Sequence, residues 1–141
     1  MCIRDSSYIF IGFDLKKDPR KLNKAYNDSS NLTKRFNLNL LTSINNDLQA
    51  NFNLNKFVHY GTYNPLLGAM ESFLISSIKQ QVSIKKIKKT YSFEAYETIH
   101  LEYSFKFSIE DIENLAKKSK FTIEKYYKNN DKGFTNTLWK K

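Results

Sequence analysis

The sequence has few of the residues on which several classes of functional site depend. Its 141 residues include one cysteine, Cys2, with two histidines, four glycines and two prolines. A single cysteine excludes an intrachain disulfide and a cysteine-based zinc site. No glycine-rich nucleotide loop, no Gly-x-Ser-x-Gly motif and no Cys–His nucleophile arrangement occurs. We therefore expect no nucleophilic catalysis and no cofactor cradle built from this chain alone.

Long apolar runs are also missing, and no stretch reaches the roughly 18 residues of a transmembrane helix. Residues 1–6 are too short and too polar for a signal peptide. We therefore expect a cytoplasmic, monomeric protein without membrane contact. His59 and His100 stand in no recognisable ligand motif, so both are expected to be structural and no metal is expected.

Aromatic residues and positive charge, by contrast, are abundant. With 11 Phe, 9 Tyr and 40% hydrophobic residues, the chain is expected to fold as a domain with its own core. A net charge of +9 permits nucleic-acid contact, and residues 85–89 hold four lysines. A basic nucleic-acid-binding module is therefore one hypothesis. It is disfavoured because no aromatic stacking motif accompanies the lysines, which are expected to lie in a solvated strand or turn.

The first half of the chain shows strand and helix patterns. The continuous apolar run 8–13 predicts a strand buried on both faces, as in a parallel sheet. Asp18 and Pro19 predict a helix start, with a helix to about residue 27. A second helix is predicted over 32–48, with an apolar stripe formed by Phe36, Leu40, Leu41, Ile44 and Leu48.

The second half is rich in strands. Ser108 predicts the N-cap of a helix, with an acidic residue three positions later. A turn is predicted at 129–133, between the last two strands. The predicted strands cover residues 58–63, 69–77, 81–84, 88–93, 121–127 and 134–139.

The segment from His100 to Phe107 alternates between apolar and polar residues. Its polar positions, Glu102, Ser104 and Lys106, are predicted to share one face of a strand. That face could be an ordinary solvated surface or the floor of a polar pocket. From the residues alone the solvated surface is favoured.

Several motifs together resemble a known family. They are Gly12-Phe13-Asp14-Leu15-Lys16-Lys17-Asp18, Ala25-Tyr26-Asn27-Asp28, Met70-Glu71-Ser72-Phe73-Leu74 and Glu102-Tyr103-Ser104-Phe105-Lys106-Phe107. In these motifs the chain resembles the C-terminal half of the histidine-specific, S-adenosylmethionine-dependent methyltransferases, a family with members in ergothioneine biosynthesis. The resemblance covers roughly residues 8 to 141.

The resemblance implies an α/β fold, which in this chain alone would be α+β. It would be the C-terminal part of a class I Rossmann-like methyltransferase with an inserted, mixed α+β substrate-binding lobe. Residues 7–14 would form a strand of the methyltransferase sheet, 15–104 the lobe, and 105–141 a helix and hairpin that return to the sheet. Residues 1–6 match nothing in the family and are expected to be a non-native start. S-adenosylmethionine would be bound mainly by a part upstream of residue 7, so this fragment alone is expected to be inactive.

The resemblance also implies a substrate site without a catalytic residue. Tyr26 would hold the substrate carboxylate, and Glu102 with Ser104 would hydrogen-bond the imidazole of histidine, whose α-amine accepts the methyl groups. The geometry is plausible, because residues i and i+2 of a strand lie about 7 Å apart on one face. A neutral imidazole offers one donor and one acceptor, which a carboxylate and a hydroxyl can match.

The chain departs from the family at two positions. Ser72 stands where a Met often forms the pocket wall, which could shift the preference toward another amino acid or amine. Asn31 stands where Gly is common, and Asn tolerates a left-handed conformation. Lys106 has no implied substrate role and is expected to be structural.

Overall fold

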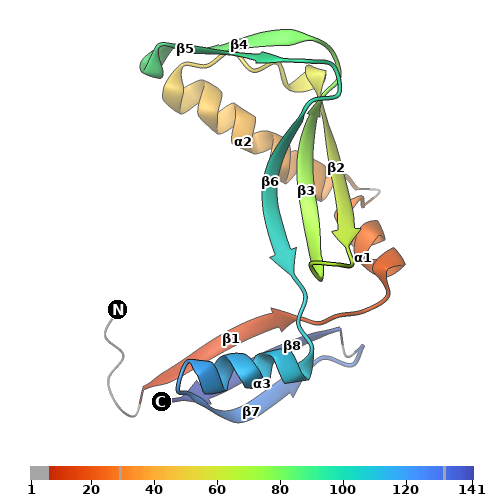
Figure 1. The fold of residues 1–141 in the computed structure, drawn as a ribbon, viewed down its shortest axis with the longest axis vertical. Coiled ribbons are helices and arrows are strands. Elements are labelled where there is room, and N and C mark those ends of the chain that lie inside the picture. The colour runs from red at the N-terminus through yellow and green to blue at the C-terminus, as the bar shows by residue number, and fades with distance from the viewer. Residues whose placement is uncertain (1–6, 29, 132) are drawn as a thin grey trace. The chain divides into compact units, whose positions relative to one another are not determined.

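The computed structural model describes residues 7–28, 30–131 and 133–141, so the predicted non-native start at 1–6 lies outside the described residues. It divides the chain into two compact units (Figure 1). The terminal unit comprises Met1–Asp18, Pro65–Ala69 and Phe105–Lys141, and the central unit comprises Pro19–Asn64 and Met70–Ser104.

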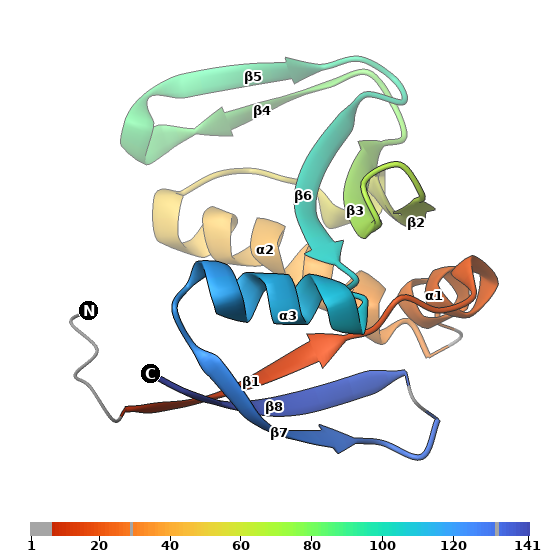
Figure 2. The same cartoon turned by 60° about the horizontal axis from the view of Figure 1, so that its bottom comes forward.

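The terminal unit is a three-stranded antiparallel sheet with one helix. Its strands lie in the order β1 (Tyr8–Asp14), β8 (Phe134–Lys140), β7 (Thr122–Lys128). Helix α3 (Ile109–Lys118) lies against one face of this sheet, as Figure 2 shows. The buried residues between them are Phe13, Leu15, Ile112, Ala116 and Trp139.

Strand β1 differs from its prediction as a strand buried on both faces in a parallel sheet. Among the described residues it pairs antiparallel with β8 and lies at the edge of the sheet. Phe13 is 5% exposed, whereas Tyr8 and Phe10 on the other face are 56% and 62% exposed. The prediction is wrong for the described part of the chain because α3 covers one face of β1 and leaves the other to solvent. The unit is α+β, and the Rossmann-like sheet remains a prediction.

Helix α3 begins at a complete capping box, which confirms the predicted N-cap. The Oγ of Ser108 accepts a hydrogen bond from the amide of Asp111 at 3.0 Å, and Asp111 Oδ2 accepts from the amide of Ser108 at 2.8 Å. Lys16 Nζ also lies 2.8 Å from Asp111 Oδ2. The Lys16 hydrogen bond, followed by those of Ser108, lowers the pKa of Asp111 to about 2.

The central unit places two helices beside a second three-stranded sheet, in the order β2-β3-β6. Helix α2 (Leu32–Leu48) runs along one face of this sheet, and α1 (Pro19–Tyr26) lies beside β2 (Figure 1). The remaining elements are η1 (Leu54–Lys56), β2 (Phe57–Asn64), β3 (Ala69–Ser76), β4 (Gln80–Ile84), η2 (Lys85–Ile87), β5 (Lys89–Phe93) and β6 (Thr98–Phe105). Strands β4 and β5 form an antiparallel hairpin.

The helix prediction over 32–48 is confirmed, but its apolar stripe is only partly correct. Leu41 is 1% exposed and packs in the core with Phe52, Phe57, Leu74, Val82 and Ile84. Phe36 and Leu40 are instead 74% and 46% exposed. The first half of α2 therefore presents two large apolar side chains that the core does not use.

The lysine-rich segment forms an exposed turn, as predicted. Lys85 and Lys86 lie in η2, and Lys89 begins β5. All of these lysines are exposed. In the described part of the chain, no helix has the length and apolar character needed to cross a membrane.

Candidate functional site

The predicted polar face of residues 102–106 is divided in the structure. Strand β6 ends at Phe105, so Glu102 and Ser104 lie on the strand and Lys106 lies beyond it. Lys106 is 3% exposed, and its Nζ lies 2.9 Å from Asp14 Oδ2 within the terminal unit. The prediction that Lys106 continues the strand face is therefore wrong, because its ammonium pairs with a carboxylate on β1. The prediction that Lys106 is structural agrees with this ion pair.

Glu102 lines a cavity of about 300 Å³ in the central unit. The opposite wall is the first half of α2, which explains why Phe36 and Leu40 are not in the core. The chemistry of the cavity is mixed, with a carboxylate, two amides, a hydroxyl and three large apolar side chains. Its lining residues are Phe36, Asn37, Asn39, Leu40, Ser43, Leu101 and Glu102.

Ser72 lies against the Glu102 carboxylate. Its side chain on β3 is 0% exposed, and its Oγ donates to Glu102 Oε1 over 3.4 Å. The Ser72 hydroxyl helps to orient the Glu102 carboxylate by donating to it. A Met at position 72 could not do so, because a thioether has no hydrogen to donate. Ser104 is half-buried near the end of β6 and is not among the side chains that line the described cavity.

Tyr26, the third predicted contact, lines a different cavity, of about 250 Å³. This cavity lies where α1 ends and α2 begins, beside β2. Its lining residues are Tyr26, Asn27, Asp28, Asn31, Lys34, Val58 and His59. The structure therefore brings Glu102 and Ser72 together and places Tyr26 in a neighbouring part of the same unit.

Hydrogen bonds through His59 connect the two cavities. His59 Nε2 lies 3.0 Å from the carbonyl oxygen of Tyr26, and His59 Nδ1 lies 3.2 Å from Asn37 Nδ2. Asn37 is 4% exposed and lines the Glu102 cavity. The sequence analysis did not identify Asn37 or His59 as site residues, although a polar residue at a buried position of a helix is a signal that could have identified Asn37.

Asparagine side chains of the α1 region bond the outer edge of β2. Asn27 Oδ1 accepts from the amide of Gly61 at 3.1 Å, and Asn27 Nδ2 donates to the carbonyl of Gly61 at 2.8 Å. Asn23 Oδ1 accepts from the amide of Tyr63 at 2.9 Å. A Cβ at Gly61 would lie 3.0 Å from Tyr26 Cβ, so a larger residue here would press on the end of α1. Together these contacts hold the segment that carries Tyr26 against the strand.

The start of α2 is fixed by Asp28 and Asn31. Asn31 has φ 56° and ψ 28°, which confirms that asparagine here takes the left-handed conformation. Asp28 accepts hydrogen bonds from the amides of Leu32 and Thr33 and from the hydroxyl of Ser30. The Ser30 hydroxyl, followed by the Leu32 amide, lowers the pKa of Asp28 to about 2.

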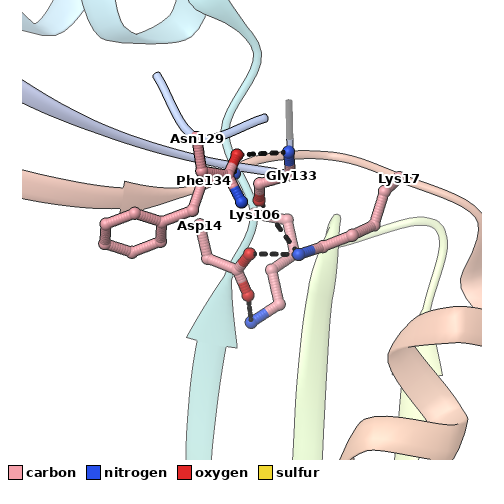
Figure 3. Close-up of polar contacts among 6 residues, drawn as sticks. All are labelled: Asp14, Lys17, Lys106, Asn129, Gly133 and Phe134. Atoms are coloured by element: carbon pink, nitrogen blue, oxygen red, sulfur yellow. Dashed lines mark hydrogen bonds and ion pairs between the residues drawn. The ribbon is translucent and has the colours of Figure 1, made fainter. Parts of the chain in front are cut away.

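A separate charged cluster lies in the terminal unit at the end of β1 (Figure 3). Asp14 accepts from Lys17 Nζ at 2.6 Å and from Lys106 Nζ at 2.9 Å, and Lys17 also donates to the carbonyl of Gly133 at 2.9 Å. Burial by itself would raise the pKa of Asp14, but the hydrogen bonds and charges of Lys17 and Lys106 outweigh it. The pKa therefore lies below the ordinary value of 3.8.

The four glycines all lie near side chains of this chain. A Cβ added at each would approach Phe134 at Gly12, Tyr26 at Gly61, Lys16 at Gly68 and Lys17 at Gly133. Among the described residues, no three His, Cys, Asp or Glu side chains lie close enough to hold a metal ion.

The sequence of the chain is similar to that of several known proteins. A family model described as histidine-specific methyltransferase, SAM-dependent, matches residues 1–141. The chain is 33% identical to histidine N-alpha-methyltransferase of Mycobacterium tuberculosis over 105 residues, which are 74% of this chain and 33% of the relative. It is also 33% identical to the protein of the same name from Mycolicibacterium smegmatis over 104 residues, 74% of this chain and 32% of the relative.

A third, more distant relative also matches. The chain is 26% identical to ergothioneine biosynthesis protein 1 of Schizosaccharomyces pombe over 120 residues, 84% of this chain and 15% of the relative. The chain thus spans about a third or less of the length of the curated relatives that it matches.

Proposed function

The chain belongs to the histidine-specific, S-adenosylmethionine-dependent methyltransferases, and on this premise we propose that the full-length protein transfers methyl groups to the α-amine of histidine. Two relatives that are 33% identical carry the name histidine N-alpha-methyltransferase. The methyl donor supplies an electrophilic methyl carbon, and the sequence of this chain has no glycine-rich loop to bind it. The role of this chain is therefore to bind and orient the methyl acceptor.

The observation that carries the proposal is the cavity in which Glu102 faces α2. A carboxylate held by the Ser72 hydroxyl is a strong acceptor for an imidazole N–H. In the proposed site, Ser104 donates to the other ring nitrogen and Tyr26 holds the substrate carboxylate. A substrate side chain without a matching donor would cover the exposed Glu102 carboxylate without replacing its hydrogen bonds to water, so apolar amino acids are disfavoured.

These contacts would serve catalysis by alignment. Methyl transfer to an amine is a direct displacement, and the amine must be unprotonated and in line with the methyl carbon. Fixing the carboxylate and the imidazole of histidine fixes the α-amine between them, which lowers the entropic part of the barrier. No side chain of this chain is proposed as a nucleophile or a metal ligand.

A second candidate is the same reaction on another amino acid or amine. It is favoured by Ser72, which is 0% exposed and bonded to Glu102 where related enzymes often have a Met. Methyl transfer by the full-length protein to a panel of amino acids and amines separates the two candidates. A substrate preferred over histidine would replace the first candidate by the second.

The Glu102→Gln variant of the full-length protein tests the proposed role of the carboxylate. Loss of a hydrogen bond to a charged group is expected to raise the KM for histidine roughly 10- to 100-fold. Glu124→Gln changes an exposed carboxylate on β7 and serves as the matched control. Equal KM values for the Glu102 and Glu124 variants would contradict the proposed binding of imidazole by Glu102.

A further inference from the structure

The hydrogen bonds of His59 and Asn37 join the two cavities of the central unit. We propose that this pair positions Tyr26 relative to the Glu102 cavity, and thereby sets the length of substrate that spans the two contacts. The inference rests on the proposed function and adds two positioning residues to it. His59 would act through Tyr26 and touch no reacting atom.

The hydrogen-bond partners of His59 match one tautomer of its imidazole. The carbonyl of Tyr26 can only accept, so His59 Nε2 carries the proton that is donated to it. Asn37 Nδ2 can only donate, so His59 Nδ1 accepts. Both bonds are made together by the tautomer that carries its proton on Nε2. Because Asn37 is 4% exposed, loss of the imidazole would leave a buried amide donor without this acceptor.

The place of Tyr26 in the chain makes this contact effective. Tyr26 is the last residue of α1, and its carbonyl oxygen points beyond the helix to His59 on β2. Asn27 bonds Gly61, two residues further along the same strand. The charged groups that line the cavity with His59 are Asp28, which caps α2, and Lys34. Asp28 bonds the first amides of α2, whereas His59 bonds the helix further along, at Asn37.

The test compares two His59 variants in the full-length gene product. His59→Phe keeps a ring and removes both hydrogen bonds, whereas His59→Gln keeps one donor and one acceptor. We expect His59→Phe to raise the KM for histidine roughly tenfold, because a lost buried hydrogen bond has about this effect on affinity. We expect kcat to stay within about twofold of the original, and His59→Gln to restore most of the affinity.

A double-mutant cycle with Tyr26→Phe shows whether His59 acts through Tyr26. Coupled residues give non-additive effects, so His59→Phe should raise KM little further once Tyr26 is changed. Asn45→Ala is the control for general destabilisation, since Asn45 bonds the backbone of Phe52 from the same helix, α2. We expect Asn45→Ala to lower the melting temperature without changing KM.

The outcomes separate this inference from the proposed function. Failure of the unmodified full-length protein to methylate histidine would overturn the proposed function, and the role of His59 in it. Activity with equal KM values for His59→Phe and the unmodified protein, or additive effects in the cycle, would overturn the inference alone. Histidine-selective ¹⁵N NMR adds a readout independent of activity, since an imidazole protonated at Nδ1 would contradict the assigned hydrogen bonds.

Discussion

At the scale of single residues, the Asp14 carboxylate in the terminal unit pairs with two ammonium groups, those of Lys17 and Lys106. Lys106 contributes a side chain with 0% exposure, whereas Lys17 and Asp14 are each 31% exposed. The three charges are therefore not equivalent. The ammonium of Lys106 depends on a nearby carboxylate, while Asp14 has solvent and Lys17 as further partners.

Asp14→Asn is accordingly expected to destabilise the protein more than Lys106→Met. The asparagine would leave a buried ammonium facing a neutral amide, at a cost of about 3 kcal/mol in the free energy of unfolding. Lys106→Met keeps the apolar stem and leaves Asp14 bonded to Lys17, so about 1 kcal/mol is expected. Urea unfolding near neutral pH measures both. The reverse order of destabilisation would contradict the unequal roles of the two charges.

Single residues also mark the limit of prediction from sequence. Asn31 was expected to tolerate a left-handed conformation in place of Gly, and it adopts one, with φ 56°. Lys106 was wrongly placed on the strand face, because alternation of residue types continues past Phe105 although the strand does not. Its partner Asp14 is 92 positions earlier in the chain, and no local pattern carries such a contact.

At the scale of elements, periodicity and capping residues predicted the helices well. Helix 32–48 and the Ser108 cap were correct because both depend on neighbours within one or two turns. The same periodicity placed Phe36 and Leu40 in the core, since hydrophobicity alone does not distinguish a core from a cavity wall. The apolar run of β1 was read as fully buried for the same reason. Which faces are covered is a property of the packing of elements.

The contact between α1 and β2 gives a prediction at this scale. In Gly61→Ala the new Cβ would lie 3.0 Å from Tyr26 Cβ, so the end of α1 must shift by a few tenths of an ångström. For the full-length protein we expect a rise of roughly threefold to tenfold in the KM for histidine, because small displacements of a positioning group weaken binding. Steady-state kinetics with histidine measure this rise.

Gly68→Ala is the matched control for this substitution. Gly68 has φ +65°, so alanine there is strained by about 1 kcal/mol, but its Cβ would meet only Lys16 at 3.6 Å. We expect a lower melting temperature and an unchanged KM. A KM that rises equally in both glycine variants would indicate general loosening instead of displacement of Tyr26.

At the scale of the whole molecule, the carboxylates with lowered pKa values predict the response to acid. Asp28 and Asp111 have pKa values of about 2, below their ordinary 3.8. A lowered folded-state pKa stabilises the fold above the ordinary value, and this stability is lost as pH falls through about 4 toward about 2. Because both side chains are partly exposed and screened by solvent, the loss through each is modest.

Unfolding free energies measured from neutral pH to about pH 2 check this expectation. In Asp111→Asn the free energy of unfolding should fall less steeply between about pH 4 and pH 2, the acid limb of the pH curve, because the neutral amide does not titrate. Asp47→Asn replaces an exposed carboxylate on α2 and is the control. An acid limb as steep in Asp111→Asn as in the unmodified protein would contradict the contribution of Asp111.

A second prediction at this scale concerns activity. We expect purified residues 1–141 to transfer no methyl group to histidine, because their sequence has no glycine-rich cofactor loop. The full-length protein, assayed in parallel with labelled S-adenosylmethionine, is the positive control. Methylhistidine formed by residues 1–141 alone would show that this chain binds the methyl donor itself.

The asparagine contacts along β2 have a consequence for self-association. β2 is an edge strand, and the outward amides of Gly61 and Tyr63 are already bonded by Asn27 and Asn23. An edge whose amides are occupied is a poor template for adding a strand from another molecule, which is a common route to aggregation. This protection comes from side chains of a neighbouring helix and its end, so it lasts only while α1 stays docked. Aggregation could thus begin from a nearly native molecule, in which only α1 has detached.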